Sequence, residues 1–216
     1  MKKAIIILAA VMSLVVCPCV FADDLFPPPW QRGQSGTTYQ RWEFSTNNTT
    51  PSREDDFYNP NGNGPALRVD PRGDWLQVVD GRQGVWPLSG ELDMYIPNWR
   101  TQNPEKWIYI QLTWKPGNND QTPFLPDSPV IGIFENPIGT VTMLPRIDSE
   151  LEQGWKLSQF KINIQPNPLE EWLTVKGDIL VDQIVVDTIC IPEPATILLF
   201  GISGLMTLAR RKRAKV

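Results

Sequence analysis

Apolar and polar residues alternate in short runs along most of the chain, and this pattern restricts the protein to folds built from β-strands. In the clearest run, residues 106–114, Ile108 and Ile110 share one face, whereas Trp107 and Tyr109 share the other. A period of two residues is typical of a strand with one buried face. Similar runs predict further strands at residues 39–44, 66–69, 75–79, 91–96, 130–134, 140–144, 173–175 and 179–188.

Turn-forming sequences rich in Pro, Gly and Asn separate these runs, and no stretch shows the sustained period of an amphipathic helix. Between Leu157 and Phe160 the apolar positions change phase, which predicts one inserted residue, a β-bulge, near Ser158 and Gln159. Because parallel sheets need crossover helices, we expect an all-β fold, an antiparallel two-sheet sandwich of jelly-roll type. A single barrel is the alternative.

Composition excludes several classes of function. The chain contains no histidine, which excludes Ser-His-Asp and Cys-His catalysis and His-ligated metal sites. Seven of the 20 basic residues lie near the two ends, so residues 23–194 hold 13 basic and 24 acidic side chains, a net charge of −11. Such a charge repels nucleic acid. Cys190 is the only cysteine beyond residue 22, so we expect no internal disulfide.

The N-terminal residues have the pattern of a secretory signal peptide. Lys2 and Lys3 precede an apolar run at residues 4–16, and Ala22 ends a short sequence suited to signal peptidase. We therefore expect export through the Sec machinery and cleavage after Ala22. The chain then divides into four expected units: signal peptide 1–22, Pro- and Gly-rich segment 23–36, β-sandwich domain 37–190 and C-terminal signal 191–216.

The C-terminal signal joins a Pro-Glu-Pro tripeptide, an apolar segment at residues 195–209, and a basic cluster, in that order. This tail resembles the PEP-CTERM sorting signal. The resemblance implies that a hydrophobic helix first holds the chain in the inner membrane. It also implies that an exosortase, a membrane-embedded transpeptidase-like enzyme, then recognises and cleaves the tail. The signal residues are Pro192, Glu193, Pro194, Arg210, Arg211, Lys212 and Arg213.

The same resemblance implies a destination outside the cell. Exosortase substrates reach the cell surface or the extracellular matrix of Gram-negative bacteria that make exopolysaccharide. Residues 27–33, 38–44 and 179–190 also resemble parts of sandwich domains that often precede such tails and have no assigned activity. A permanent single-pass anchor is the alternative interpretation of the tail, whose apolar segment is short for a membrane span.

Nine tryptophans suggest carbohydrate binding, because a planar ring stacks on the apolar face of a pyranose. Trp107 and Tyr109 lie on the expected polar face of their strand, and Trp99 lies in a loop with Pro and Asn nearby. These three are the predicted carbohydrate-binding residues, and exopolysaccharide is the predicted ligand. Packing of the tryptophans in the core is the competing interpretation.

Two other groups of side chains offer alternative chemistry. Oxygen ligands of the kind that calcium takes are concentrated in residues 53–64, although a turn explains their spacing better. Glutamate pairs at residues 150/152 and 170/171 are compatible with glycoside hydrolysis, although surface charge is the simpler explanation. The calcium ligands considered are Asp55, Asp56, Asn59 and Asn61.

The sequence thus predicts an exported, non-catalytic β-domain without a required cofactor that binds or organises polysaccharide. A structural surface protein without a ligand is the first alternative. A small carboxylate-based enzyme acting on glycosides is the second.

Overall fold

The computed structural model describes residues 24–48, 56–60, 64, 66–69, 74–99, 102–117, 128–136 and 139–192. The expected signal peptide and the apolar and basic parts of the C-terminal signal lie outside these ranges. Within them the strands pair antiparallel, and the helical structure is a short 3-10 helix, η2 (Glu152–Gly154). The prediction of an all-β, antiparallel fold is confirmed.

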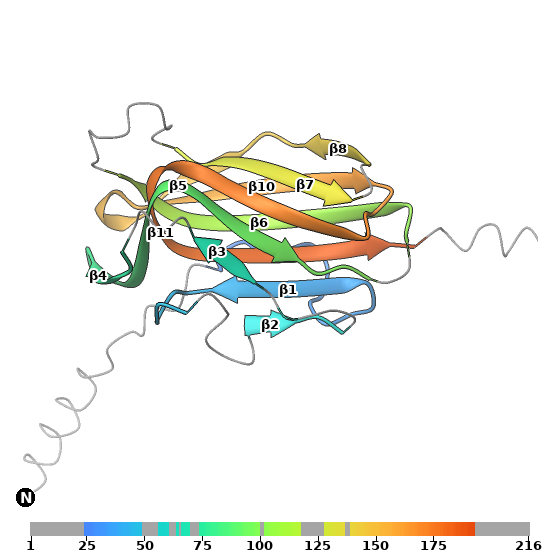
Figure 1. Cartoon of the computed structure of the whole chain (residues 1–216), viewed down its shortest axis with the longest axis horizontal. Coiled ribbons are helices and arrows are strands. Elements are labelled where there is room, and N and C mark those ends of the chain that lie inside the picture. The colour runs from blue at the N-terminus through green and yellow to red at the C-terminus, as the bar shows by residue number, and fades with distance from the viewer. Residues whose placement is uncertain are drawn as a thin grey trace, which may run out of the picture.

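Eleven strands follow one another along the described part of the chain (Figure 1). The longest are β5, β6, β10 and β11, and they form the middle of the sheet. The strands are β1 (Thr37–Trp42), β2 (Phe57–Tyr58), β3 (Leu67–Val69), β4 (Leu76–Val79), β5 (Arg82–Ile96), β6 (Glu105–Pro116), β7 (Val130–Asn136), β8 (Thr140–Met143), β9 (Ile147–Glu150), β10 (Lys156–Gln165) and β11 (Glu170–Ile191).

Strand β11 organises the sheet because it pairs with four other strands. Its first part, up to Val181, pairs with β5 on one side and with β7 on the other. Its last part pairs with β6 and β1. The register shifts between Val181 and Gln183, close to the change of partners. We call β3, β5, β7 and the first part of β11 the β5 wing, and β1, β2, β6, β8, β9, β10 and the last part of β11 the β6 wing.

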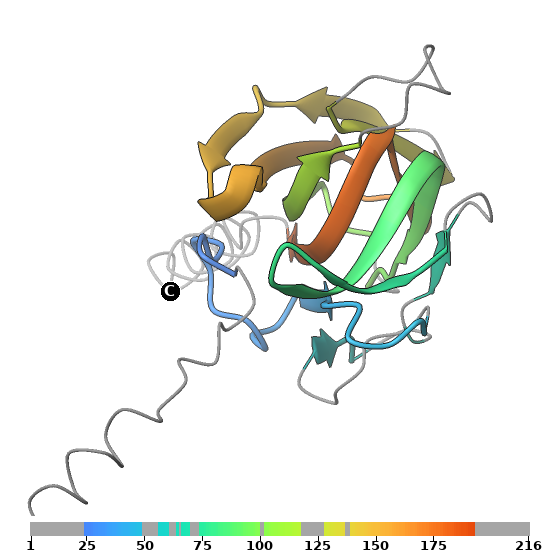
Figure 2. The same ribbon diagram turned by 90° about the vertical axis from the view of Figure 1, so that its left-hand side faces the viewer.

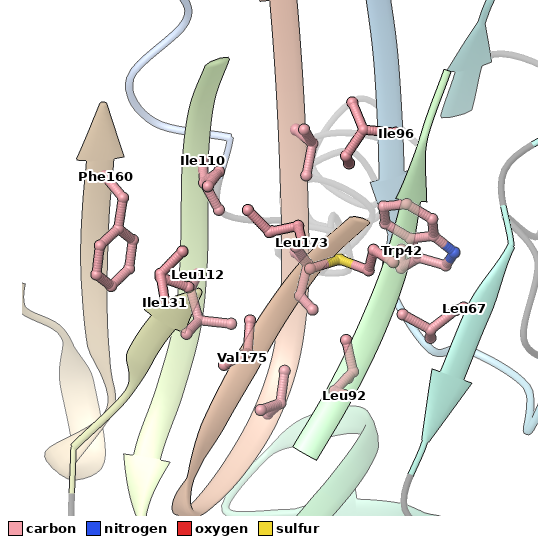
Figure 3. Packing of buried hydrophobic residues seen from close by; sticks show 14 of the residues in the cluster. Trp42, Leu67, Leu92, Ile96, Ile110, Leu112, Ile131, Phe160, Leu173 and Val175 are labelled. Atoms are coloured by element: carbon pink, nitrogen blue, oxygen red, sulfur yellow. The ribbon is translucent and has the colours of Figure 1, made fainter. Parts of the chain in front are cut away.

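One hydrophobic core lies between the two wings. Leu173 and Val175 from the first part of β11 belong to the same buried cluster as Ile184 and Val186 from its last part. Figure 3 shows side chains from strands of both wings pointing toward one another, and Figure 2 shows β11 running beside β5 around this interior. Each fully buried aliphatic side chain contributes about 1.5–3 kcal/mol, so this cluster is the main source of stability.

Each strand predicted from alternation overlaps an observed strand. The predicted runs at residues 173–175 and 179–188 are parts of β11, which continues through them as one strand. The short strands β2 and β9 were not predicted, because two and four residues carry too little periodicity. The described strands join into one sheet through β11, and the two-sheet sandwich of jelly-roll type stays a prediction.

The predicted bulge near Ser158 and Gln159 is wrong. β10 pairs with β6 in unbroken register through this region. The apolar phase changes because both faces of β10 are buried there: Leu157 is fully buried on one face, and Ser158 is fully buried on the other. Ser158 is satisfied on the inner face by a 2.7 Å hydrogen bond from the indole of Trp114. The irregular register occurs in β11 instead.

Candidate functional site

The predicted carbohydrate-binding residues Trp107 and Tyr109 lie on the outer face of β6 and are half-buried. Their ring centroids are 6.5 Å apart, but their planes meet at 63°, so they do not form a flat platform. Trp30 packs edge-on against Tyr109 at 4.7 Å, and the Lys161 ammonium lies 4.9 Å from the same ring. Trp99 lies in the β5–β6 connection. The outer face at Tyr109 is therefore occupied by the protein itself.

The segment 24–36, predicted to precede the domain, packs across this face through Arg32. The guanidinium donates from Nε to Oδ1 of Asp187 at 2.6 Å and from Nη2 to Oδ2 at 2.7 Å, and it also binds Asp24. Burial opposes ionisation of Asp24, but hydrogen bonds from Arg32 and Gln111 outweigh it and lower the pKa of that carboxyl. Burial raises the pKa of Asp187. This network holds the segment on the β6 wing.

The predicted calcium ligands are only partly within the described residues. Asp56 is fully buried, and its carboxylate accepts a 2.7 Å hydrogen bond from Nε of Arg41. Asn59 is half-buried just after β2, whereas Asp55 and Asn61 lie outside the described residues. Within the described ranges, no group of three His, Cys, Asp or Glu side chains is placed to hold a metal ion.

The glutamate pairs considered for catalysis do not face a common site. Residues 170 and 171 are neighbours in β11, so their side chains lie on opposite faces of the sheet. Glu171 is fully buried and hydrogen-bonded to Lys106 and Asn98. Glu150 forms a 2.9 Å surface ion pair with Lys156. These carboxylates are used inside the fold or on its surface.

Three aromatic side chains that the sequence did not single out form a row on the outer face of the β5 wing. Trp172 of β11 pairs with Phe134 of β7 on one side and with Tyr95 of β5 on the other. Phe134 is 61% exposed and Trp172 is 38% exposed. The rings of Tyr95 and Trp172 lie 5.5 Å apart at 62°. Phe134 and Trp172 present apolar surface to solvent, and Tyr95 is half-buried beside them.

Polar side chains lie directly beside this aromatic row. Thr174 donates a 2.6 Å hydrogen bond to Asp93, and Lys176 forms a 2.8 Å ion pair with Glu91. Arg68 pairs in register with Asp93 from the neighbouring strand β3. Together with the aromatic rings, these residues form a hollow of about 400 Å³. We call this hollow the β5 groove. It is lined by Arg68, Glu91, Asp93, Phe134, Trp172, Thr174 and Lys176.

One sequence signal was available for the β5 groove. In residues 170–176, Trp172, Thr174 and Lys176 alternate with the buried Leu173 and Val175, which indicates that they point outward. The pairing of these positions with Phe134 and Tyr95 is a property of the sheet register, which the sequence does not reveal.

Comparison with known proteins identifies the C-terminal signal. Residues 191–213 match the PEP-CTERM protein-sorting motif. No curated protein and no solved structure matches the chain. Among the described residues, none of the helices has the length and apolar character needed to span a membrane. The predicted sorting signal is confirmed: the chain carries the PEP-CTERM motif of exported proteins that an exosortase processes.

Proposed function

We propose that this protein is exported, is processed at its PEP-CTERM motif, and then presents a non-catalytic β-domain that binds a neutral exopolysaccharide in the β5 groove. The observation that carries the proposal is the pair of exposed rings Phe134 and Trp172, which line the groove next to Tyr95, with hydrogen-bonding side chains directly beside them. This proposal moves the binding site from the face around Trp107 to the opposite wing.

The composition of the β5 groove suits a sugar polymer. Aromatic rings pack against the apolar faces of pyranoses, and adjacent polar groups exchange hydrogen bonds with the hydroxyls. Two acidic side chains, Glu91 and Asp93, are balanced by two basic ones, Arg68 and Lys176. Because the groove carries no net charge, it favours a neutral polymer over a strongly anionic one.

The carboxylates of the groove support a binding role. Asp93 accepts a hydrogen bond from Thr174, and Glu91 is paired with Lys176. Glycosidases need one carboxyl group that donates a proton and a second that acts as base or nucleophile. Glu91 instead orients the Lys176 ammonium, which would contact a bound sugar, and Asp93 is held in place by the buried hydroxyl of Thr174.

The proposal is tested by measuring binding of the purified protein to a panel of neutral and acidic bacterial polysaccharides. Trp172→Ala should weaken binding about tenfold, which corresponds to about 1.4 kcal/mol. Trp107→Ala is the matched control, because it removes a half-buried tryptophan on the other wing, and it should bind like the wild type.

Two results would contradict the proposal. If Trp107→Ala lost binding and Trp172→Ala kept it, the binding site would lie on the outer face of β6 instead. Absence of binding to every polymer on the panel would favour a structural surface protein without a ligand.

A further inference from the structure

Three polar side chains meet in the interior, where the β5–β6 connection crosses the two ends of β11. They are Lys106 of β6, Glu171 of β11 and Asn98 of the connection, and they are 0%, 0% and 7% exposed. Nζ of Lys106 donates to Oδ1 of Asn98 at 2.6 Å and also to Oε1 of Glu171. Nδ2 of Asn98 donates to Oε2 of Glu171 at 2.5 Å. Each member therefore contacts the other two.

The groups that surround this trio are buried as well. Cys190, which is 2% exposed, places its Sγ 3.8 Å from Oδ1 of Asn98, and burial raises the pKa of this thiol. Nδ2 of Asn98 also donates to the carbonyl oxygen of Pro168 at 2.6 Å. Removing a lysine and a glutamate from water is costly, and replacing such a buried pair with apolar residues is often neutral or stabilising. Stability alone therefore does not explain why the trio is present.

We propose that Lys106 and Asn98 join in an intramolecular amide cross-link, with Glu171 as the catalytic residue. The geometry supplies each requirement. The Lys106 amine lies beside the Asn98 carboxamide that it would attack. One carboxylate oxygen of Glu171 accepts a hydrogen bond from this amine, and the other accepts one from Nδ2 of Asn98, the leaving group. Transfer of a proton from the Lys106 ammonium to the carboxylate that accepts its hydrogen bond, Glu171, gives the neutral amine. The neutral amine that results is the nucleophilic form.

The reaction balances without an oxidant or a co-reactant. Nζ of Lys106 forms a bond to Cγ of Asn98, and the bond between Cγ and Nδ2 breaks. The two protons that Nζ loses pass through Glu171 to Nδ2, which leaves as ammonium. Glu171 ends in the ionisation state in which it began. The products are one new amide bond and one ammonium ion.

The cross-link would fix the β5–β6 connection over the end of β11. Cys190 lies in this cluster, and the PEP-CTERM motif begins at the next residue, 191. The covalent bond would therefore reinforce the point where the domain continues into its sorting tail.

Peptide mapping of the purified full chain tests the cross-link. Trypsin should fail to cut after Lys106, and a branched peptide should join the stretches that hold Asn98 and Lys106, lighter by about 17 Da, one ammonia. Glu171→Gln should restore cleavage and abolish the mass loss. Asn98→Asp should instead lose about 18 Da, one water, because a hydroxyl replaces the amide as leaving group.

Lys156→Met, which removes a surface lysine paired with Glu150, should leave the branched peptide unchanged. Two wild-type results would overturn the proposal. The first is linear peptides of unmodified mass with cleavage after Lys106. The second is a loss of about 18 Da in the wild type, which would place the bond on Glu171. Because the wild-type map decides the question, a variant that fails to fold does not obscure it.

Discussion

Two nitrogens of the Arg32 guanidinium donate hydrogen bonds to the buried carboxylate of Asp187, at 2.6 and 2.7 Å. These bonds hold the N-terminal segment against the last strand, although the two residues are 155 positions apart in sequence. Asp187 is 1% exposed, and the guanidinium also lies 4.0 Å from the ring centroid of Tyr39. Because of these contacts, residues 24–36 pack on the folded domain and cover part of the outer face of the β6 wing.

Arg32→Met should destabilise the protein by about 3 kcal/mol, because it leaves Asp187 buried without its charged partner. Chemical denaturation at neutral pH measures the change. Lys156→Met is the matched control, since it breaks an ion pair whose Glu150 partner is 70% exposed and should cost less than about 1 kcal/mol. Equal effects of the two variants would show that the segment is not held by Arg32.

Alkaline pH should destabilise the protein through Tyr39. Burial is the main cause that raises the pKa of this phenol from 10.0 to about 12. Its contribution to stability is complete below pH 10. It is lost as the pH rises to about 12, because the unfolded chain gives up the proton first. Denaturation curves between pH 9 and 12 should show this loss, and Tyr39→Phe should make it smaller. An unchanged slope in that variant would assign the effect to another group.

Gly84→Ala should be strongly destabilising, by about 3 kcal/mol, because two costs add at this position. Gly84 has a φ of 78°, and a Cβ there would lie 1.8 Å from the carbonyl oxygen of Phe44, which accepts a 2.8 Å hydrogen bond from Trp75. Gly33→Ala is the control, because Gly33 has a φ of 83° but no atom within 4 Å of its Cβ position. Its cost should be about 1 kcal/mol, the conformational part alone. Equal melting temperatures for the two variants would contradict the close approach to Phe44.

Processing should depend on the matched motif. Replacing Pro192, Glu193 and Pro194 together with alanine should leave the full-length chain in the membrane fraction of a cell that contains an exosortase, because the tripeptide is part of the matched signal. Trp172→Ala, which lies in the β5 groove, should be processed normally. Immunoblots of membrane and extracellular fractions compare the two, and normal release of the triple variant would show that another segment directs export.

The sequence predicted the all-β class and the positions of the strands other than β2 and β9, because alternation is a local property of each strand. Lys106 and Glu171 continue the phase of buried neighbours such as Ile108 and Leu173. The interpretation of the glutamate pair at 170/171 as surface charge was nevertheless wrong for Glu171, which is fully buried. The sequence could not show that the Lys106 and Glu171 side chains meet with Asn98. That contact depends on β11 pairing with β5 at one end and with β6 at the other.

The choice between the two outer faces also belongs to the tertiary structure. Trp107 and Trp172 have the same sequence signal, a large ring on the polar side of an alternating strand. Trp30 packs on Tyr109 next to Trp107, whereas Trp172 stands in an exposed row with Phe134. The local sequence therefore determined that both rings point outward. The packing of a distant segment decided which face stays open, because that packing depends on contacts such as Arg32 with Asp187, which lie far apart in the chain.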